Sequence, residues 1–162
     1  MRLTVTPLEA NAFAPFGDVL HADQCSERRS INAGHTERFH DLARLTLDAD
    51  GGRACLSIFR TRPLPTPLRL TTMERHPLSS QAFYPLSNRP WLVVVAPAGV
   101  LEPAAIRVFQ ARGDQGVNFH PGTWHHFSLA LGATSDFLVI DRSDGAPDCD
   151  EQTLPEPLEI VL

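Results

Sequence analysis

The amino-acid sequence predicts a single all-β domain, arranged as an antiparallel sandwich or a barrel and opened by one short N-terminal helix. Fourteen prolines and ten glycines divide the 162 residues into short pieces. Most of these pieces have strand character and end at Pro, Gly, Asn or Asp, as expected of antiparallel strands joined by turns. No long segment keeps a helical period. The length allows one well-buried core and is too short for two ordinary domains, so residues 1–162 are expected to form one domain.

A strand and a brief helix are expected at the N-terminus. Residues 3–5 have strand character. The TPLE segment at 6–9 is typical of a helix start, because its threonine can cap, its proline suits the first turn, and its glutamate stands three residues after the cap. The helix is expected to end near Gly17, since glycine commonly follows the last helical residue.

The remaining strands are expected in short runs that follow one another to the C-terminus. A proline-rich tail at 147–162 is expected to lie over the core as a strap. The expected strands cover residues 18–21, 31–33, 54–60, 68–76, 81–86, 91–96, 106–110, 116–120, 125–130 and 137–141.

Composition excludes several classes of function. A net charge of −5 argues against nucleic-acid binding, which needs a basic face. The chain contains no lysine, which excludes Schiff-base catalysis, and its arginines are too scattered to form a polybasic membrane patch. No segment resembles a signal sequence or a membrane span, so a cytoplasmic protein is expected. Cys25, Cys55 and Cys149 form no CxxC pair, which argues against a disulfide framework or a cysteine-rich zinc site.

The most informative segment is GVNFHPGTWHHF at 116–127. Pro121 and Gly122 predict a tight corner, because proline fixes its own φ and glycine permits backbone angles that other residues avoid. His125 follows this corner at the start of an expected strand, so its imidazole should point to one defined face. A histidine held in this way is a candidate acid, base or metal ligand.

Alternation along strands predicts which side chains share a face. In the expected strand that ends at His76, Leu70 and Glu74 point the same way as that histidine. In the expected strand 125–130, His125 shares a face with Leu129. If the faces of both leucines line a barrel, the two histidines and the glutamate project into one cavity. A few polar groups above an apolar floor are typical of a small-molecule site.

Two motifs resemble those of the cupin superfamily. The segment PGTWH contains the Pro, Gly and His of the second cupin motif, and Glu74-x-His76 followed by Gln81 resembles the first motif. This resemblance implies a cupin-type double-stranded β-helix, or jelly-roll barrel. It places Glu74, His76, Gln81 and His125 at the metal-ligand positions, although Glu replaces a usual His and Gln replaces the usual Glu. Such groups suit nickel, zinc or manganese, or they can work without metal as acid and base. Both alternatives stay open, and no organic cofactor is expected.

A more specific resemblance covers nearly the whole chain. The segments INAGHTERFHDLARL (31–45), MERHPLSSQAFYPL (73–86), GVNFHPGTWHHFSL (116–129) and the region 136–156 resemble the ureidoglycolate lyase family in order and spacing. This resemblance implies a cupin barrel, usually a homodimer. It also implies cleavage of ureidoglycolate into glyoxylate and urea, a late reaction of allantoin degradation.

The implied reaction needs an acid, a base and a partner for the substrate carboxylate. Near neutral pH the natural proton carriers are His and a carboxyl group with a raised pKa, so His125 with His76 or Glu74 are the candidates. Gln81 can form a hydrogen bond to the urea or the hydroxyl group. The carboxylate calls for an arginine, because guanidinium binds carboxylate through two parallel hydrogen bonds. Arg38 and Arg75 are the candidates, although alternation turns Arg75 away from the cluster.

Three further residues are candidates for substrate binding, and each has a structural alternative. Asn32 and His40 can equally be turn residues. His120 can instead cap a strand edge or bind a backbone carbonyl, as can its neighbour His126. Two alternative functions also remain: an ammonia-releasing ureidoglycolate amidohydrolase, which needs an activated water, and a cupin that binds a small acid without catalysis.

Overall fold

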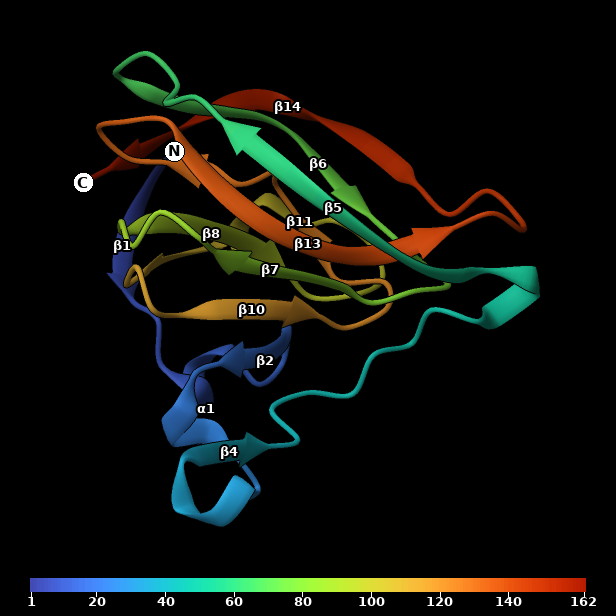
Figure 1. Cartoon of the computed structure of the whole chain (residues 1–162). Coiled ribbons are helices and arrows are strands. Elements are labelled where there is room, and N and C mark those ends of the chain that lie inside the picture. Colours follow the sequence, from blue (N-terminus) through green and yellow to red (C-terminus); the bar gives the residue numbers. More distant parts are fainter.

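The computed structural model describes residues 1–162, and its main feature is a closed, mixed β-barrel (Figure 1). Strand β11 pairs with both β6 and β8 and thereby closes the sheet, while β1 runs parallel to its neighbours β14 and β9. The short strand β12 (Leu129–Ala130) continues along β8. In spatial order the barrel strands are β6 (Leu68–Arg75), β14 (Asp150–Val161), β1 (Arg2–Pro7), β9 (Arg107–Ala111), β8 (Trp91–Ala96) and β11 (Trp124–His125).

A second sheet of five antiparallel strands packs against this barrel and creates a second apolar core. Strand β8 contributes to both cores, because Val94 points into the barrel while Val93 and Val95 point toward the second sheet. A strand buried on both faces consists of consecutive apolar residues, and the sequence of β8, WLVVVA, has this pattern. The strands of the second sheet, in spatial order, are β2 (Gly17–Leu20), β10 (Gly116–Phe119), β7 (Gln81–Pro85), β13 (Ser135–Ser143) and β5 (Arg53–Thr61). The predicted all-β, cupin-type fold is therefore confirmed.

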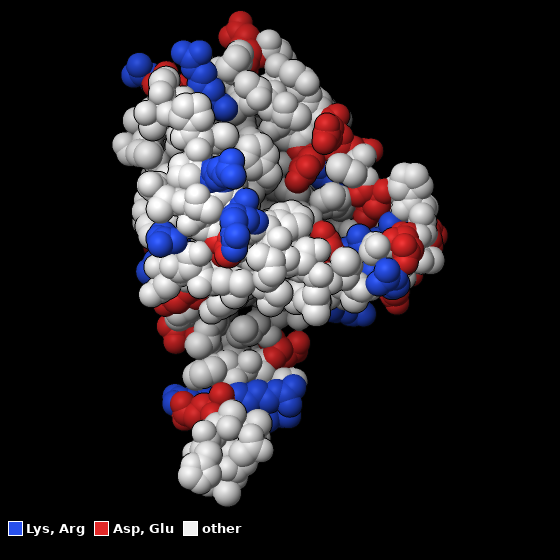
Figure 2. All heavy atoms as spheres, turned by 45° about the horizontal axis from the view of Figure 1, so that its top comes forward, with Lys and Arg blue, Asp and Glu red and all other residues white.

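A two-stranded hairpin projects from the rest of the molecule (Figures 1 and 2) and consists of β3 (Glu27–Ile31) and β4 (Thr36–His40). Its surface carries both basic and acidic side chains (Figure 2). The prediction of a strand at 31–33 was wrong. Asn32 and Ala33 have φ values of 55° and 54°, which place them in the left-handed region at the tip of the hairpin.

The N-terminal helix α1 (Ala10–Phe13) is short, as predicted, although it ends at Phe13, ahead of the expected end near Gly17. The predicted capping box was wrong. Strand β1 continues through Pro7, because it pairs with β9 as far as the Pro7–Gln110 register. The residue before the helix is Glu9, whose side chain forms no capping hydrogen bond. Pairing in the sheet therefore takes precedence over the local capping signal.

Two further segments differ from the sequence prediction. Most of the tail expected as a strap forms β14, a strand of the barrel, and the two prolines within β14 fall where the β14–β6 register shifts between Thr153 and Leu158. Proline is tolerated there because the ladder is already interrupted. The strand expected at 125–130 is split into β11 and β12, and between them Phe127 is 48% exposed.

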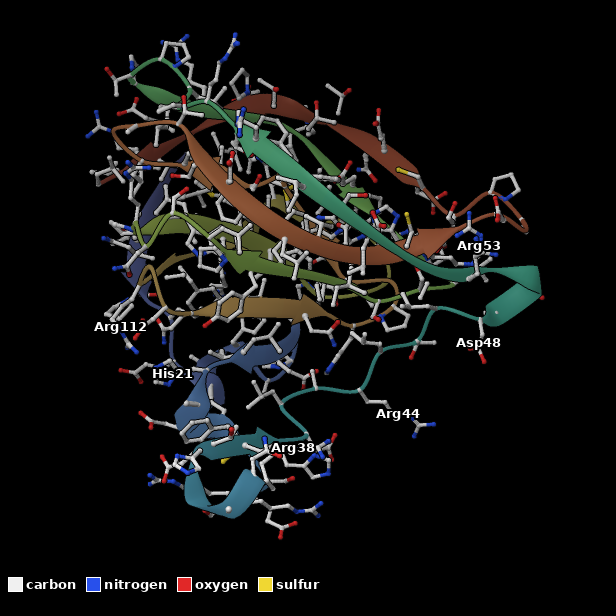
Figure 3. All side chains as sticks on the ribbon, in the orientation of Figure 1. His21, Arg38, Arg44, Asp48, Arg53 and Arg112 are labelled. Atoms are coloured by element: carbon white, nitrogen blue, oxygen red, sulfur yellow. The ribbon has the colours of Figure 1, made fainter.

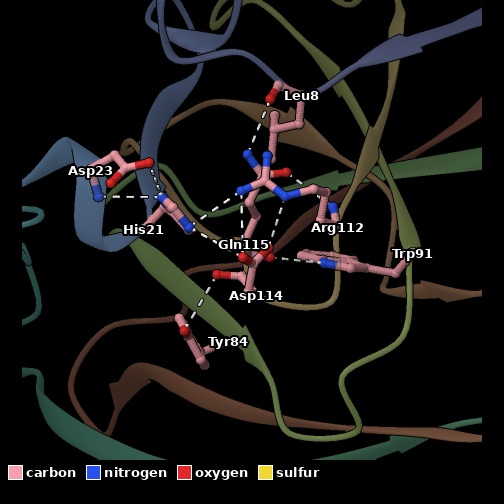
Figure 4. Close-up of polar contacts among 8 residues, drawn as sticks. All are labelled: Leu8, His21, Asp23, Tyr84, Trp91, Arg112, Asp114 and Gln115. Atoms are coloured by element: carbon pink, nitrogen blue, oxygen red, sulfur yellow. Dashed lines mark hydrogen bonds and ion pairs between the residues drawn. The ribbon is translucent and has the colours of Figure 1, made fainter.

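A polar network holds the N-terminal segment against the end of β9 (Figure 4). The Gln115 amide donates a hydrogen bond to the Leu8 carbonyl (3.3 Å) and accepts one from the Arg112 backbone N–H (3.0 Å). The Trp91 indole donates to the Gln115 carbonyl (3.1 Å). The shared glutamine thus joins three separate parts of the chain. None of the helices is long and apolar enough to cross a membrane.

Candidate active site

Three ionisable side chains meet between the barrel and the second sheet. Glu74 lies at the end of β6 and His125 lies opposite it in the ladder on β11, while His76 follows β6 directly. One possible ligand atom from each residue lies within 4.8 Å of the others. The two imidazole rings have centroids 5.3 Å apart, and the His125 ring stacks on Phe119 of β10 at 4.4 Å. The two layers thus bring Glu74, His76 and His125 together.

The predicted sharing of one face by Leu70 and Glu74, and of another by His125 and Leu129, was wrong. Leu70 and Leu129 lie in the core inside the barrel, whereas His125 packs against Phe119 in the second core. Along β6 the alternation is interrupted close to the register shift with β14, because Leu70 and Met73 both lie in the barrel core, so Leu70 and Glu74 do not share a face. Between His125 and Leu129 the strand itself is broken. Because both strands contain an interruption, the polar residues still converge.

A backbone carbonyl fixes the tautomer of His76. The Nδ1 atom of His76 lies 2.6 Å from the carbonyl oxygen of Asp148, which can only accept a hydrogen bond. Nδ1 therefore carries the proton, and Nε2 keeps its lone pair, which is buried and has no partner in the protein. The Asp148 carboxylate in turn accepts hydrogen bonds from the Leu78 N–H and the Ser79 hydroxyl, each at 2.6 Å. These hydrogen bonds connect the loop that contains Asp148 to the segment that follows His76.

Asp148 was not among the residues predicted from the sequence. Its contact with His76 uses a backbone oxygen, which every residue has, so the amino-acid type gives no direct signal. The nearest indication is its position in the 136–156 region that resembles the ureidoglycolate lyase family.

Removing the Asp148 carboxylate should impair turnover through His76. In Asp148→Ala the backbone carbonyl remains, but its loop loses two hydrogen bonds and holds the imidazole less firmly. We expect kcat to fall about 10- to 100-fold, as for other groups that orient a catalytic or ligating histidine. The measurement is kcat and KM separately, with circular dichroism as a control for folding. A fall in melting temperature with unchanged kcat would reduce Asp148 to a purely structural residue.

His125 is a neutral imidazole in the folded protein. It is 1% exposed, and neither ring nitrogen has a hydrogen-bond partner in the protein. Burial, with a contribution from the nearby His76, lowers the pKa of His125 to about 3. Its Nδ1 lies 3.7 Å from a carboxylate oxygen of Glu74. Burial also raises the pKa of the Glu74 carboxyl, although His76 opposes this shift. Free nitrogen lone pairs therefore lie beside a carboxyl group that can hold a proton.

The buried His125 predicts how the stability of the metal-free protein depends on pH. Its folded pKa lies below the ordinary value of 6.5, so the unfolded chain binds the proton first as the pH falls. This contribution to stability is complete above about pH 6.5 and is lost progressively toward pH 3. Urea unfolding at several pH values should show a shallower decline for His125→Ala than for the unmodified protein. Parallel declines would contradict the prediction.

Two hollows flank the cluster. The first measures about 340 Å³ and contains His76 and Gln81, while the second measures about 240 Å³ and contains Glu74 and His125. The first is completed by Ser79, Asp141, Arg142, Asp144, Gly145, Ala146, Pro147, Asp148 and Cys149. The second is completed by Thr71, Thr72, Met73, His126, Phe127 and Glu151.

The predicted substrate residue Gln81 faces the first hollow. It is 6% exposed, and its side-chain oxygen has no partner in the protein. Its amide nitrogen lies 3.5 Å from the carboxylate of Asp141 on β13, a residue that the sequence analysis did not single out. Asp141 ends the apolar run FLVI, so its only sequence signal is an acidic residue at the end of a buried strand.

Neither arginine proposed from the sequence lines a hollow. Arg75 binds the Asp150 carboxylate at 2.8 Å and the Gly99 carbonyl at 2.9 Å, and its guanidinium lies over the Trp124 ring. Arg38 lies on the projecting hairpin, away from the barrel (Figure 3). Arg142 does line the first hollow, but its guanidinium donates to carbonyl groups of the surrounding loops.

The remaining candidates also lie outside both hollows. Asn32 is at the hairpin tip, where its amide donates to the Thr36 hydroxyl at 3.1 Å, which supports the turn alternative. His40 ends β4. His120 follows β10, and its Nε2 lies 3.2 Å from the Asp18 carboxylate. Within this chain, Asn32 and His120 have partners outside the cluster, and His40 lies on the hairpin. None of the three belongs to the cluster.

A cupin-type barrel with a buried His–Glu cluster beside two hollows belongs to the class of proteins that bind or transform a small molecule at such a site. Comparison with known proteins narrows this class. The family model described as ureidoglycolate lyase matches residues 1–161, and the chain belongs to that family.

Relatives named ureidoglycolate lyase share about half of their residues with this chain. The protein from Burkholderia mallei (strain NCTC 10229) is 50% identical over 156 residues, which are 96% of this chain and 91% of the relative. The protein from Burkholderia cepacia is 52% identical over 150 residues, or 92% and 84% of the two chains. The protein from Azotobacter vinelandii is 48% identical over 161 residues, or 99% and 96%.

Proposed function

We propose that this protein is a ureidoglycolate lyase, which cleaves ureidoglycolate to glyoxylate and urea in allantoin degradation. The observation that carries the proposal is the cluster of Glu74, His76 and His125, whose free ring nitrogens have no role in holding the fold together. Membership in the ureidoglycolate lyase family supports the choice of substrate. We also propose the cytoplasm as the site of this reaction.

The reaction moves one proton between two atoms attached to the same carbon. The hydroxyl group loses its proton as its oxygen becomes the carbonyl oxygen of glyoxylate. The carbon–nitrogen bond breaks, and the departing nitrogen gains a proton to give urea. A carboxyl group beside that carbon can accept the first proton and deliver the second. Glu74 is half-buried against His125 at the edge of a hollow, and its raised pKa lets it hold the proton in between.

The cluster also fits a divalent cation, and we propose nickel, zinc or manganese. Nε2 of His76, a ring nitrogen of His125 and an oxygen of Glu74 would hold the ion, and imidazole and oxygen ligands suit these metals. When bound, the ion would supply positive charge and lower the pKa of the substrate hydroxyl.

The negative charges of the substrate and of the hollows favour a bound cation. The substrate is an anion, both hollows contain carboxylates, and the one arginine that lines them, Arg142, is already bound to carbonyls. With an ion bound, Glu74 would still be the residue that moves the proton. In a metal-free site, Nε2 of His76 accepts the hydroxyl proton instead.

The experiment is to incubate the purified protein with racemic ureidoglycolate and to measure urea, glyoxylate and ammonia separately. Equal amounts of urea and glyoxylate are expected. Dialysis against a chelator should abolish turnover, and nickel, zinc or manganese should restore it. Full activity after chelation would contradict a bound metal and support the metal-free acid–base mechanism. Ammonia without urea would point to the amidohydrolase, and no turnover with any metal would point to a cupin that binds a small acid without catalysis.

We also propose a homodimer, as the family resemblance implies. Support comes from β5, the edge strand of the second sheet, on which Leu56 and Ile58 are 69% and 56% exposed. Exposed apolar side chains grouped on one strand are typical of a protein–protein contact. The purified chain should have twice its monomer mass in light scattering, and Ile58→Asp should shift it toward the monomer. A monomeric unmodified protein would overturn this proposal.

A further inference from the structure

We propose that Asp141, together with Gln81, binds the ureido end of the substrate and thereby determines which way round ureidoglycolate enters the site. This inference rests on the proposed function and adds to it a specificity-determining residue and an orientation.

The inner face of the second sheet changes from apolar to polar at one end. Along β13, Phe137 and Val139 belong to the second core, and Asp141 is the next residue on the same face. Along β7, Phe83 belongs to that core and Gln81 is the next residue on that face. The two polar side chains therefore lie side by side at the end of an apolar wall, 3.5 Å apart.

Among the carboxylate and amide oxygens that line the first hollow, those of Asp141 and Gln81 are the least occupied by partners. The Asp148 carboxylate is used by the Leu78 N–H and the Ser79 hydroxyl. The Asp144 carboxylate pairs with Arg53, the first residue of β5. Figure 3 labels this arginine. By contrast, the amide oxygen of Gln81 has no partner, and the Asp141 carboxylate has one long contact, with the Gln81 amide.

Such an acceptor pair matches one end of ureidoglycolate and repels the other. The ureido group, –NH–CO–NH₂, presents N–H donors, which a carboxylate and an amide oxygen can accept. The carboxylate of the substrate has no donor and would be repelled by Asp141. The ureido end therefore faces Asp141 and Gln81.

This orientation also fits the position of the cluster. His76 lines the same hollow as Asp141 and Gln81, its ring centroid lies 5.3 Å from that of His125, and ligand atoms of His76 and Glu74 lie within 4.8 Å of each other. With the ureido end on the β7–β13 wall, the carbon that carries the hydroxyl lies toward the imidazoles and the substrate carboxylate lies beyond it. The bond that breaks is then next to His76, the member of the cluster that lines this hollow.

The test is the substitution Asp141→Asn, which keeps the shape of the side chain and removes its charge. We expect KM for ureidoglycolate to rise about tenfold, the effect of losing a charge-assisted hydrogen bond. Inhibition by the two products separates the two ends of the substrate. The inhibition constant of urea should rise by a similar factor, while that of glyoxylate should stay unchanged or fall.

The matched control is Asp144→Asn, the same substitution in the same hollow at a carboxylate already paired with Arg53. It should leave KM and both inhibition constants near those of the unmodified protein. Melting temperatures check the fold, and Asp141→Ser repeats the test if the asparagine variant is unstable.

Two results would overturn the inference. One is an Asp141→Asn variant with unchanged urea inhibition. The other is weakened inhibition by glyoxylate instead of urea, which would place the carboxylate end of the substrate in this hollow. Failure of the unmodified protein to release urea is a different result, because it overturns the proposed function itself.

Discussion

His125→Ala is expected to lower kcat/KM for ureidoglycolate about 1000-fold or more, within the range that acid–base catalysis or a lost metal ligand accounts for. His125 contacts the other two members of the cluster, since its ring lies beside His76 and its Nδ1 is 3.7 Å from Glu74. Replacing it removes one of the two imidazoles that we propose as ligands or proton carriers and leaves the cluster incomplete. The measurement is the rate of urea release at saturating and at low substrate concentrations.

The same substitution should leave the protein folded. The ring nitrogens of His125 have no partner, so its removal breaks no hydrogen bond and eliminates two buried, unsatisfied polar atoms. This gain partly offsets the lost stacking on Phe119. His21→Ala is the matched control, because His21 also lies near a carboxylate, Asp114 at 3.2 Å, but lines neither hollow (Figure 4). If His125→Ala retained its activity, His125 would have no place in the mechanism.

The parts of the fold that were predicted correctly are those in which apolar residues bury a face. Strand β8 was predicted with its observed bounds, since WLVVVA is entirely apolar and lies between two prolines. The hairpin of β3 and β4 was missed. Its strands ERRSI and TERFH bury no face, so no alternating pattern marks them as strands.

In the site, the residues with reactive side chains could be predicted, whereas features set by a partner strand or by the backbone could not. Glu74, His76 and His125 were singled out because imidazole and carboxylate groups stood beside strand ends and a rigid corner. The position of Leu70 on the opposite face could not be predicted, since a register shift depends on the partner strand β14. Asp148 could not be predicted either, because its contact with His76 is made by the backbone.

Arg38 was expected at the site because of the motif in which it stands, and the structure places it elsewhere. The ERFHD segment made it a reasonable partner for the substrate carboxylate, yet the hairpin carries it away from the hollows of its own chain (Figure 3). Sequence proximity to a family-like motif indicates that a segment matters, but only the fold determines which site it can reach. Arg142 is the arginine that lines the hollows, and its guanidinium already binds backbone carbonyls.

Glu74→Gln is expected to lower kcat by a factor of about 100 to 10,000, the usual contribution of a group that transfers a proton in the transition state. Glutamine keeps the size of the side chain but cannot accept the hydroxyl proton and deliver it to the departing nitrogen. KM should stay the same or fall, because the substitution removes a negative charge beside an anionic substrate. This separation of kcat from KM distinguishes a proton carrier from a residue that only binds substrate.

Glu151→Gln provides the matched control for this prediction. Glu151 lies opposite Glu74 in the β6–β14 ladder and lines the same hollow, so the same charge is removed from the same place. Its carboxylate is exposed and is not a member of the His76–His125 cluster, and we expect its variant to keep most of the turnover. Equal losses in the two variants would mean that the hollow needs only negative charge. A loss confined to Glu74→Gln would identify that carboxyl group as the one that moves the proton.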